Sequence, residues 1–105
     1  MSEERQLKVM RLLENNPEMT QRELASILGI SLGAANFCLK ALVHKGWVKI
    51  DNFKKNPSKL GYLYLVTPKG IAAKTKLTIK FLKSKLLEYD ELKTEIETLE
   101  KELPY

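Results

Sequence analysis

The sequence predicts a mainly helical fold with one small β-hairpin and a long C-terminal helix. Three observations support this prediction. Two short stretches with helical apolar spacing are joined across Gly29, a strand-like run follows Gly46, and no strong helix breaker occurs between Pro68 and Pro104. At 105 residues, the chain has room for one modest core and one additional arm.

The N-terminal segment predicts a helix over residues 3–15. Leu7, Met10 and Leu13 recur at helical spacing and are expected to face the core. Asn and Pro residues at 15–17 then end the helix.

The next helix has clear start and stop signals. Thr20 and Glu23 form a capping box, in which the Thr hydroxyl accepts a hydrogen bond from the Glu23 amide. Gly29 can adopt the left-handed conformation that ends a helix without steric cost. We expect one buried apolar face on this helix, formed by Leu24, Ile27 and Leu28.

A second helix follows the turn directly. Ser31 is a second N-cap, and Gly46 stands where the helix must end. The expected buried face is formed by Ala35, Cys38, Leu39 and Leu42. Two short helices around a glycine-centred turn are typical of a helix-turn-helix, which places its second helix in a DNA major groove.

The face opposite this buried stripe is the candidate surface for reading DNA. Asn36 and Lys40 are four residues apart and therefore lie on the same side of the helix. An Asn can pair with adenine, a Lys can reach guanine or phosphate, and Phe37 could meet a thymine methyl group. The alternatives are that Asn36 is a solvated helix residue and that Phe37 packs against protein.

A β-hairpin is expected after the second helix, with strands over 47–53 and 62–66. The sequence Asn-Pro-Ser at 56–58 indicates a turn between them. The hairpin would form the wing of a winged helix-turn-helix. Three basic residues near its tip would neutralise DNA phosphates, unless the loop is simply solvated: Lys54, Lys55 and Lys59.

The C-terminal segment predicts one long helix over 68–103, capped by Thr67 with Pro68 at its first position. Apolar residues alternate at three- and four-residue steps, with Lys85 as one charged interruption. The expected dimerisation residues are Leu82, Tyr89, Leu92, Ile96, Leu99 and Leu103. The alternative is a helix that folds back entirely onto its own domain.

The flanking charges of this helix leave the orientation of a dimer open. Glu88 and Lys93 could attract each other between parallel chains, whereas Glu95 and Glu100 would repel. The sequence thus divides into a DNA-binding domain over 1–67 and a dimerisation or coiled-coil helix over 68–105.

The charge distribution favours a polyanionic partner. The net charge is +5, and residues 1–87 carry 16 Lys or Arg against six acidic residues, whereas residues 88–105 carry two Lys against seven. No apolar run is long enough to span a membrane, and the charged N-terminus does not resemble a signal peptide. We therefore expect a cytoplasmic protein without a membrane partner.

Catalysis is not expected. The sequence offers one His and one Cys, His44 and Cys38, without a third partner, a phosphate-cradling loop or a metal-ligand cluster. No metal and no cofactor are predicted. Cys38 is expected to be a buried apolar residue, with a redox-sensing thiol as the alternative.

The chain resembles the MarR type of winged helix-turn-helix regulators. The residues that carry the resemblance are MTQRELASILGISLGAANFCLKALVHKGWVKI, the wing, and LVTPKGIAAK. The short length is similar to that of MarR-like regulators associated with exopolysaccharide gene clusters. The resemblance covers residues 5–75 well and the C-terminal tail only in general character.

The resemblance implies a homodimer on a pseudo-palindromic DNA operator, without catalysis. The groove side of the second helix would then comprise Ser31, Gly33, Ala34, Asn36, Phe37 and Lys40. The first motif helix would meet phosphate through Thr20, Gln21 and Arg22. Larger relatives have a ligand pocket between two domains, which leaves a small-molecule effector as an open question.

Two functions from different classes are therefore compared. The first is a sequence-specific, double-stranded DNA-binding transcriptional regulator, whose half-sites lie about 34 Å apart, one helical turn. The alternative is a winged-helix scaffold that uses the C-terminal helix to bind a partner protein, with Leu32 and Phe37 as protein contacts.

Overall fold

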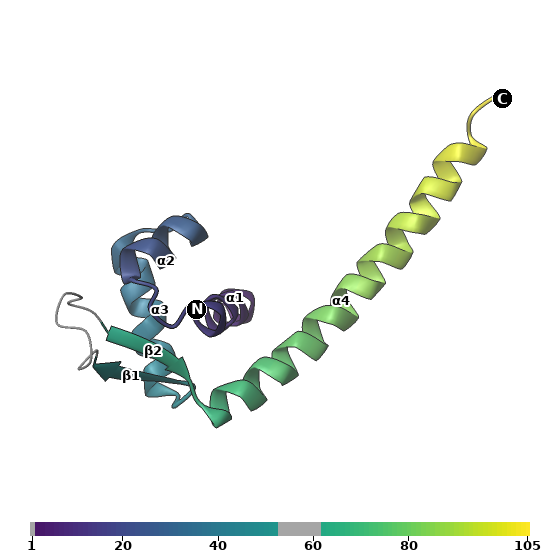
Figure 1. The fold of residues 1–105 in the computed structure, drawn as a ribbon. Coiled ribbons are helices and arrows are strands. Elements are labelled where there is room, and N and C mark those ends of the chain that lie inside the picture. The colour runs from purple at the N-terminus through teal and green to yellow at the C-terminus, as the bar shows by residue number, and fades with distance from the viewer. Residues whose placement is uncertain (1, 53–61) are drawn as a thin grey trace.

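The computed structural model describes residues 2–52 and 62–105. Four helices and one hairpin follow in the predicted order (Figure 1). Their bounds are α1 (Glu3–Asn15), α2 (Gln21–Leu28), α3 (Leu32–His44), β1 (Val48–Asn52), β2 (Tyr62–Val66) and α4 (Pro68–Lys101). The mainly helical fold class with a single hairpin is confirmed, and the predicted bounds of α1 and β2 are correct. β1 begins one residue later than predicted, α4 ends two residues earlier, and the predicted end of β1 at residue 53 lies outside the described residues.

The molecule consists of a small body and a projecting helix. The helices α1 to α3 and the hairpin form the body, which we call the winged unit (residues 2–66), and α4 extends away from it (Figure 1). The overall dimensions are therefore elongated, at 69 × 26 × 22 Å.

The hairpin is antiparallel, and Val48 lies opposite Val66 while Ile50 lies opposite Tyr64. Val48, Ile50 and Tyr64 share one face of the hairpin, where Val48 and Tyr64 are buried against the helices and Ile50 is 45% exposed. Lys49 and Asp51 lie on the other face and are exposed. The sheet thus has one face on the core and one toward solvent, as is common for antiparallel pairs.

A single apolar cluster joins α1, α2, α3 and the hairpin. Leu7, Met10 and Leu13 lie in it as predicted. The prediction for Ile27 was wrong, because its side chain is 58% exposed. The buried face of α2 is centred on Leu24 and Ala25, and three helical steps of about 100° place Ile27 on the other side of Leu24, away from α3.

The first half of α4 packs on α1. Leu77 is buried and Phe81 packs against the core cluster. Two ion pairs span the same contact, from Lys74 to Glu14 at 2.8 Å and from Lys80 to Glu3 at 2.7 Å.

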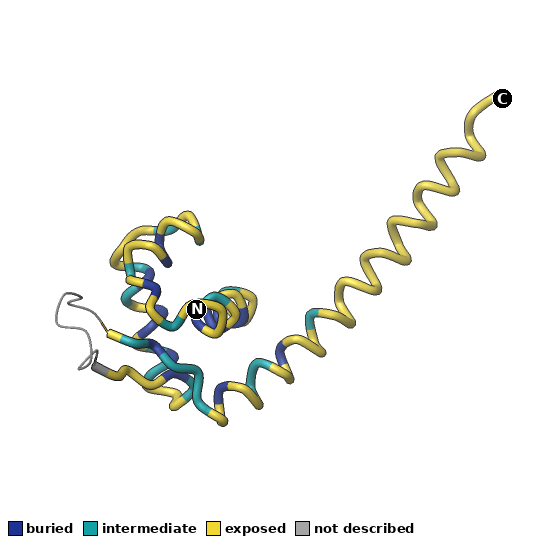
Figure 2. Tube along the Cα trace, viewed as in Figure 1, coloured by how far each residue is buried: buried dark blue, intermediate teal, exposed yellow. Residues whose placement is uncertain are grey.

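Every α4 residue after Phe81 is exposed. Figure 2 shows this part of α4 as a continuous exposed rod that leads away from the winged unit. The alternative in which the helix folds back entirely onto its own domain is therefore wrong.

Within residues 2–52 and 62–105, no single helix is long and apolar enough to span a membrane. Length and composition would suffice only for α2 and α3 taken together, and that pair is bent by 108°.

Candidate nucleic-acid interface

The turn between α2 and α3 is built around Gly29. Its φ of 67° is left-handed, and its amide donates to the carbonyl of Ser26 while the amide of Ile30 donates to that of Ala25. This pair of hydrogen bonds is a Schellman motif, which satisfies the free carbonyls at a helix end. The turn sets α2 and α3 at 108°, within the range expected of a helix-turn-helix.

The same device ends α3. Gly46 has a φ of 76°, its amide donates to the carbonyl of Val43, and the amide of Trp47 donates to that of Leu42. Lys45 lies over the Trp47 ring, with its Nζ 4.5 Å from the ring centre. The chain therefore leaves α3 in a defined direction and enters β1 after three residues, 45–47.

α3 has one buried and one exposed face. The predicted buried residues are all buried: Ala35, Cys38, Leu39 and Leu42. The exposed stripe runs along Gly33, Phe37, Lys40 and His44, at steps of four, three and four residues. Because those steps follow one helical face, these groups can meet a flat or grooved partner together.

Phe37 is 64% exposed and packs on no core residue in the described part of the chain. Leu32, at the start of α3, is 42% exposed. Phe37 thus lies on the predicted groove side, next to Lys40.

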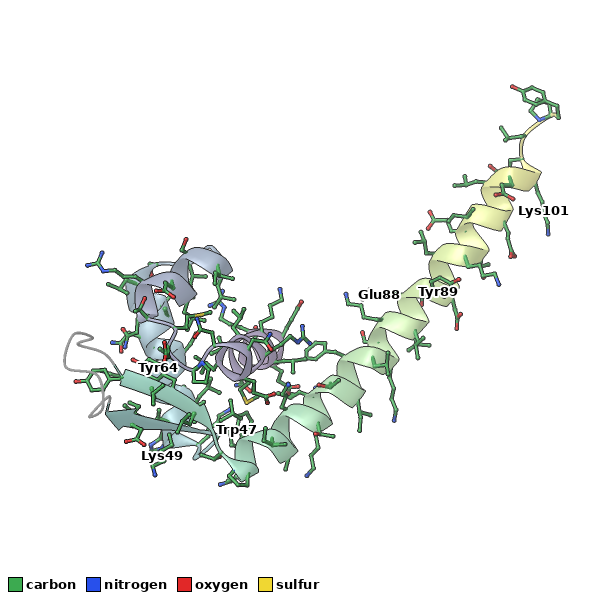
Figure 3. All side chains as sticks on the ribbon, in the orientation of Figure 1. Trp47, Lys49, Tyr64, Glu88, Tyr89 and Lys101 are labelled. Atoms are coloured by element: carbon green, nitrogen blue, oxygen red, sulfur yellow. The ribbon has the colours of Figure 1, made fainter. Side chains whose placement is uncertain are left out.

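Asn36 is half-buried and belongs to a network that the sequence did not indicate. The Gln21 side-chain amide donates to the Asn36 carbonyl oxygen at 3.4 Å and to the Tyr64 hydroxyl at 3.1 Å. The Tyr64 amide in turn donates to the carbonyl of Pro17 at 3.0 Å. The network connects α2, α3 and β2, and Figure 3 shows Tyr64 on the hairpin beside the helices.

This network changes the expected roles of two residues. Gln21 was expected to contact DNA phosphate. Its side chain is instead half-buried and donates a hydrogen bond to the Asn36 side-chain carbonyl oxygen. The Asn36 amide nitrogen keeps its donors, because only the carbonyl oxygen of that side chain is engaged in the network. Tyr64 was predicted only as a strand residue, and no spacing in the sequence connects it with Gln21.

The remaining predicted DNA-binding residues differ in how far they are exposed. The hydroxyls of Thr20 and Ser31 accept from the amides of Glu23 and Ala34, both at 3.1 Å, so each caps its helix as predicted. Thr20, Arg22 and Ser31 are exposed, whereas Ala34 is half-buried. Lys54, Lys55 and Lys59 lie outside the described residues.

Thr67 connects the hairpin to α4. Its hydroxyl donates to the Gly46 carbonyl at 2.6 Å and accepts from the Gly70 amide at 3.0 Å. A Cβ added to Gly70 would overlap the carbonyl oxygen of Trp47. The sequence Thr-Pro-Lys-Gly therefore allows α4 to begin in direct contact with the backbone that leaves α3.

Five of the predicted dimerisation residues lie on the free part of α4, and Leu103 lies just after its end. All of them are exposed: Leu82, Tyr89, Leu92, Ile96, Leu99 and Leu103. In Figure 3, Glu88, Tyr89 and Lys101 lie on this part of the helix, clear of the winged unit. Among the described residues, no group of His, Cys, Asp and Glu side chains could hold a metal ion.

Comparison with known proteins agrees with this geometry. Residues 2–49 match the model of a winged helix-turn-helix DNA-binding family. The HTH-type transcriptional regulator LrpA of Pyrococcus abyssi is 39% identical over 71 residues, which cover 68% of this chain and 50% of LrpA. The match with this curated relative thus spans half of its length.

Two crystal structures of MarR from E. coli are also similar. The apo form is 30% identical with a TM-score of 0.63, over 94% of this chain and 76% of MarR. A mutant MarR complexed with operator DNA is 31% identical with a TM-score of 0.62, over 94% of this chain and 74% of MarR. These relatives are transcriptional regulators and not enzymes, in agreement with the prediction from the sequence. The resemblance seen in the sequence thus extends over the fold, and the chain belongs to the MarR family of winged helix-turn-helix proteins.

Proposed function

We propose that this protein is a homodimeric transcriptional regulator that binds double-stranded DNA in a sequence-specific way. The observation that carries the proposal is the arrangement of α3. This helix buries its apolar side in the winged unit and leaves Lys40 exposed and Asn36 half-buried, at 108° to α2. A helix presented in this way fits a major groove, which is wide enough to admit it.

Base contacts would come from the middle of α3. Asn36 is held by Gln21 and keeps an amide group that can pair with the edge of adenine. Lys40 is exposed one turn further along and can reach guanine or phosphate. Side chains oriented before binding lose less conformational entropy on binding.

Phosphate contacts would surround these base contacts. Arg22 and the exposed Thr20 and Ser31 lie at the starts of α2 and α3, where free amides and the helix dipole favour anions. The wing lysines, Lys54, Lys55 and Lys59, would add contacts that do not depend on base sequence.

The free face of α4 supports a homodimer on a pseudo-palindromic operator. The exposed apolar residues of α4 would be covered by a second copy, which doubles the DNA contact. The half-sites of the operator would then be separated by a distance that the dimer sets. The E. coli MarR that was solved with operator DNA supports such a site.

The test is selection of bound sequences from a random duplex pool, followed by gel shifts at physiological salt and a mass measurement in solution. We expect an inverted repeat and a dimer mass. A Lys40→Gln variant should bind more weakly, whereas the matched control Lys101→Gln, at the far end of α4, should bind like the wild type. Failure to enrich any duplex would overturn the proposal.

A second candidate is a winged-helix scaffold that binds a partner protein through α4. The observation that favours it is the exposure of Leu32 and Phe37 on the surface proposed for DNA, because large exposed apolar side chains often mark protein contacts. A defined complex with another protein, together with no affinity for duplex DNA, would favour this candidate.

A further inference from the structure

We infer that two copies of this chain pair through α4 in antiparallel orientation, with residues 78–103 of one helix alongside the same residues of the other in reverse order. The inference rests on the homodimer in the proposed function and adds its orientation and register. The alternatives are a parallel pair and no pairing through α4.

The first step concerns which face of α4 is free. We call the alternating residues at 82, 85, 89, 92, 96, 99 and 103 the seam. Its six apolar members are between 46% and 63% exposed. The last α4 residue that packs on the winged unit is Phe81, and every seam residue lies beyond it. The seam therefore has no partner within the described part of the chain and needs an occupant from outside.

The second step is charge. Residues 78–87 carry three Lys and no acidic residue, whereas residues 94–103 carry four Glu and one Lys. A parallel pair would place the two segments of net charge +3 side by side, and likewise the two segments of net charge −3. An antiparallel pair places +3 beside −3 at both ends. Since residues 88–93 face their own copies in either arrangement, they do not discriminate, and the ends favour the antiparallel pair.

The third step is the charged seam residue Lys85. In a parallel pair it would face Lys85 of the second copy across the seam, which is unfavourable for two like charges. In the antiparallel pair it faces Ile96 of the second copy, with Glu95 of that copy beside it. Within its own chain, the Nζ of Lys85 is already 3.2 Å from Glu88. The antiparallel arrangement therefore surrounds this ammonium group with carboxylates.

The register follows from the seam and from the position of α1. If Leu82 lies opposite Leu99 and Tyr89 opposite Leu92, six of the seven seam residues face one another across the helix pair, and Leu103 lies opposite Thr78. The overlap then ends at Thr78, just after the region of α4 that packs on α1. A register in which the overlap extended further toward the N-terminus of α4 would bring the second helix against the winged unit.

The structure has a hollow where the end of the second helix would arrive. It has a volume of about 240 Å³ and lies between α1 and α4. In the inferred register, the end of α4 at Lys101 of one copy lies opposite residue 80 of the other, and the exposed residues 102–105 that follow lie toward this hollow. The residues that line the hollow are Glu14, Ile71, Lys74, Thr75, Thr78 and Ile79.

This pairing has a consequence for DNA. The two winged units would lie at opposite ends of the helix pair, with their Pro68 residues roughly 68 Å apart, at about 1.5 Å per residue. The half-sites are therefore expected to lie more than one helical turn of DNA apart.

Cysteine cross-linking tests the orientation. Leu82→Cys and Leu99→Cys are made as separate full-length chains that carry tags of different size. The chains are mixed, oxidised mildly and separated by mass. The native Cys38 is buried and serves as the control, because the wild type should give no cross-link. We expect a disulfide between the two different variants and none within either variant alone.

Each other outcome is also decisive. Cross-links within each single variant would show a parallel pair and overturn the inference, while the dimeric regulator would stand. A dimer without any cross-link would show that α4 is not the interface. A monomer mass would overturn the inference together with the dimer in the proposed function. An antiparallel dimer that selects no DNA would leave the inference intact and overturn only the proposed function.

Charge reversal gives a second test that does not need cysteines. Lys83→Glu with Lys85→Glu should raise the dimer dissociation constant at least tenfold, because both ends of the pair become negative. Adding Glu95→Lys and Glu97→Lys to the same chain should bring the constant back to within threefold of wild type. In a parallel pair the first two changes would strengthen association, because the charges at that end would fall from +3 beside +3 to −1 beside −1.

Discussion

The Gln21 side-chain amide donates a hydrogen bond to the Tyr64 hydroxyl at 3.1 Å and so ties the start of α2 to the strand that returns from the wing. The same amide holds the carbonyl oxygen of Asn36 on α3. One side chain thus sets the relative positions of the three elements that form the candidate DNA surface.

Removing the Tyr64 hydroxyl should loosen this surface. We expect Tyr64→Phe to lower the free energy of unfolding by about 1 kcal/mol, the usual net value of a hydrogen bond to a partly buried group. Urea denaturation measures the change. Tyr62→Phe is the matched control, because Tyr62 is exposed on the same strand and should lose almost nothing. Equal losses in both variants would contradict a structural role for the Gln21–Tyr64 bond.

Asn36→Ala tests base recognition directly. We expect a cost of about 1–3 kcal/mol on the best selected site and little change on random DNA, because a base contact adds only to sequence-specific binding. Titration of both duplexes with the variant measures the difference. Asn15→Ala, at the end of α1, should leave both affinities unchanged. A uniform loss on both duplexes would mean that Asn36 stabilises the fold or contacts phosphate.

Two glycines in helices should respond to alanine in opposite ways. Gly70→Ala should lower the free energy of unfolding by about 1–3 kcal/mol, because the new methyl group would overlap the backbone of Trp47. Gly33→Ala should raise it by about 0.5–1 kcal/mol, because the nearest atom is 4.0 Å away and alanine favours the helix. Thermal unfolding of both variants measures this. A stabilised Gly70→Ala would show that α4 begins further from the hairpin.

Neutralising the wing lysines should change the salt dependence of DNA binding more than its sequence specificity. Lys54, Lys55 and Lys59 changed together to Gln should lower the slope of log affinity against log salt by roughly three, about one for each lost phosphate contact. Lys101→Gln, at the far end of α4 and outside the seam, is the control. An unchanged slope in the wing variant would remove the wing from the DNA contact.

The Cys38 thiol should resist modification in the native state. The residue is 1% exposed on the inner side of α3, so a thiol reagent should label it only after unfolding. Labelling in buffer and in denaturant measures this. Rapid labelling of the folded protein would favour the alternative in which Cys38 is a redox-sensing thiol.

Local signals determined much of the structure in advance. The N-caps at Thr20, Ser31 and Thr67 and the stops at Gly29 and Gly46 all act between residues a few positions apart. Because such hydrogen bonds depend on neighbouring backbone, their residues can be read from the sequence alone. The helix-turn-helix, the hairpin and the long helix followed from them.

Contacts between distant elements were decided only by the tertiary structure. The exposure of Ile27, the bond from Gln21 to Tyr64 and the contact of Gly70 with Trp47 depend on the angles at which elements meet. Periodicity states which face of a helix is apolar, but it does not state how far around that face a neighbour reaches. The sequence by itself thus determined the elements and their order, and packing in three dimensions decided which side chains stayed free for DNA, because burial depends on every element that surrounds a residue.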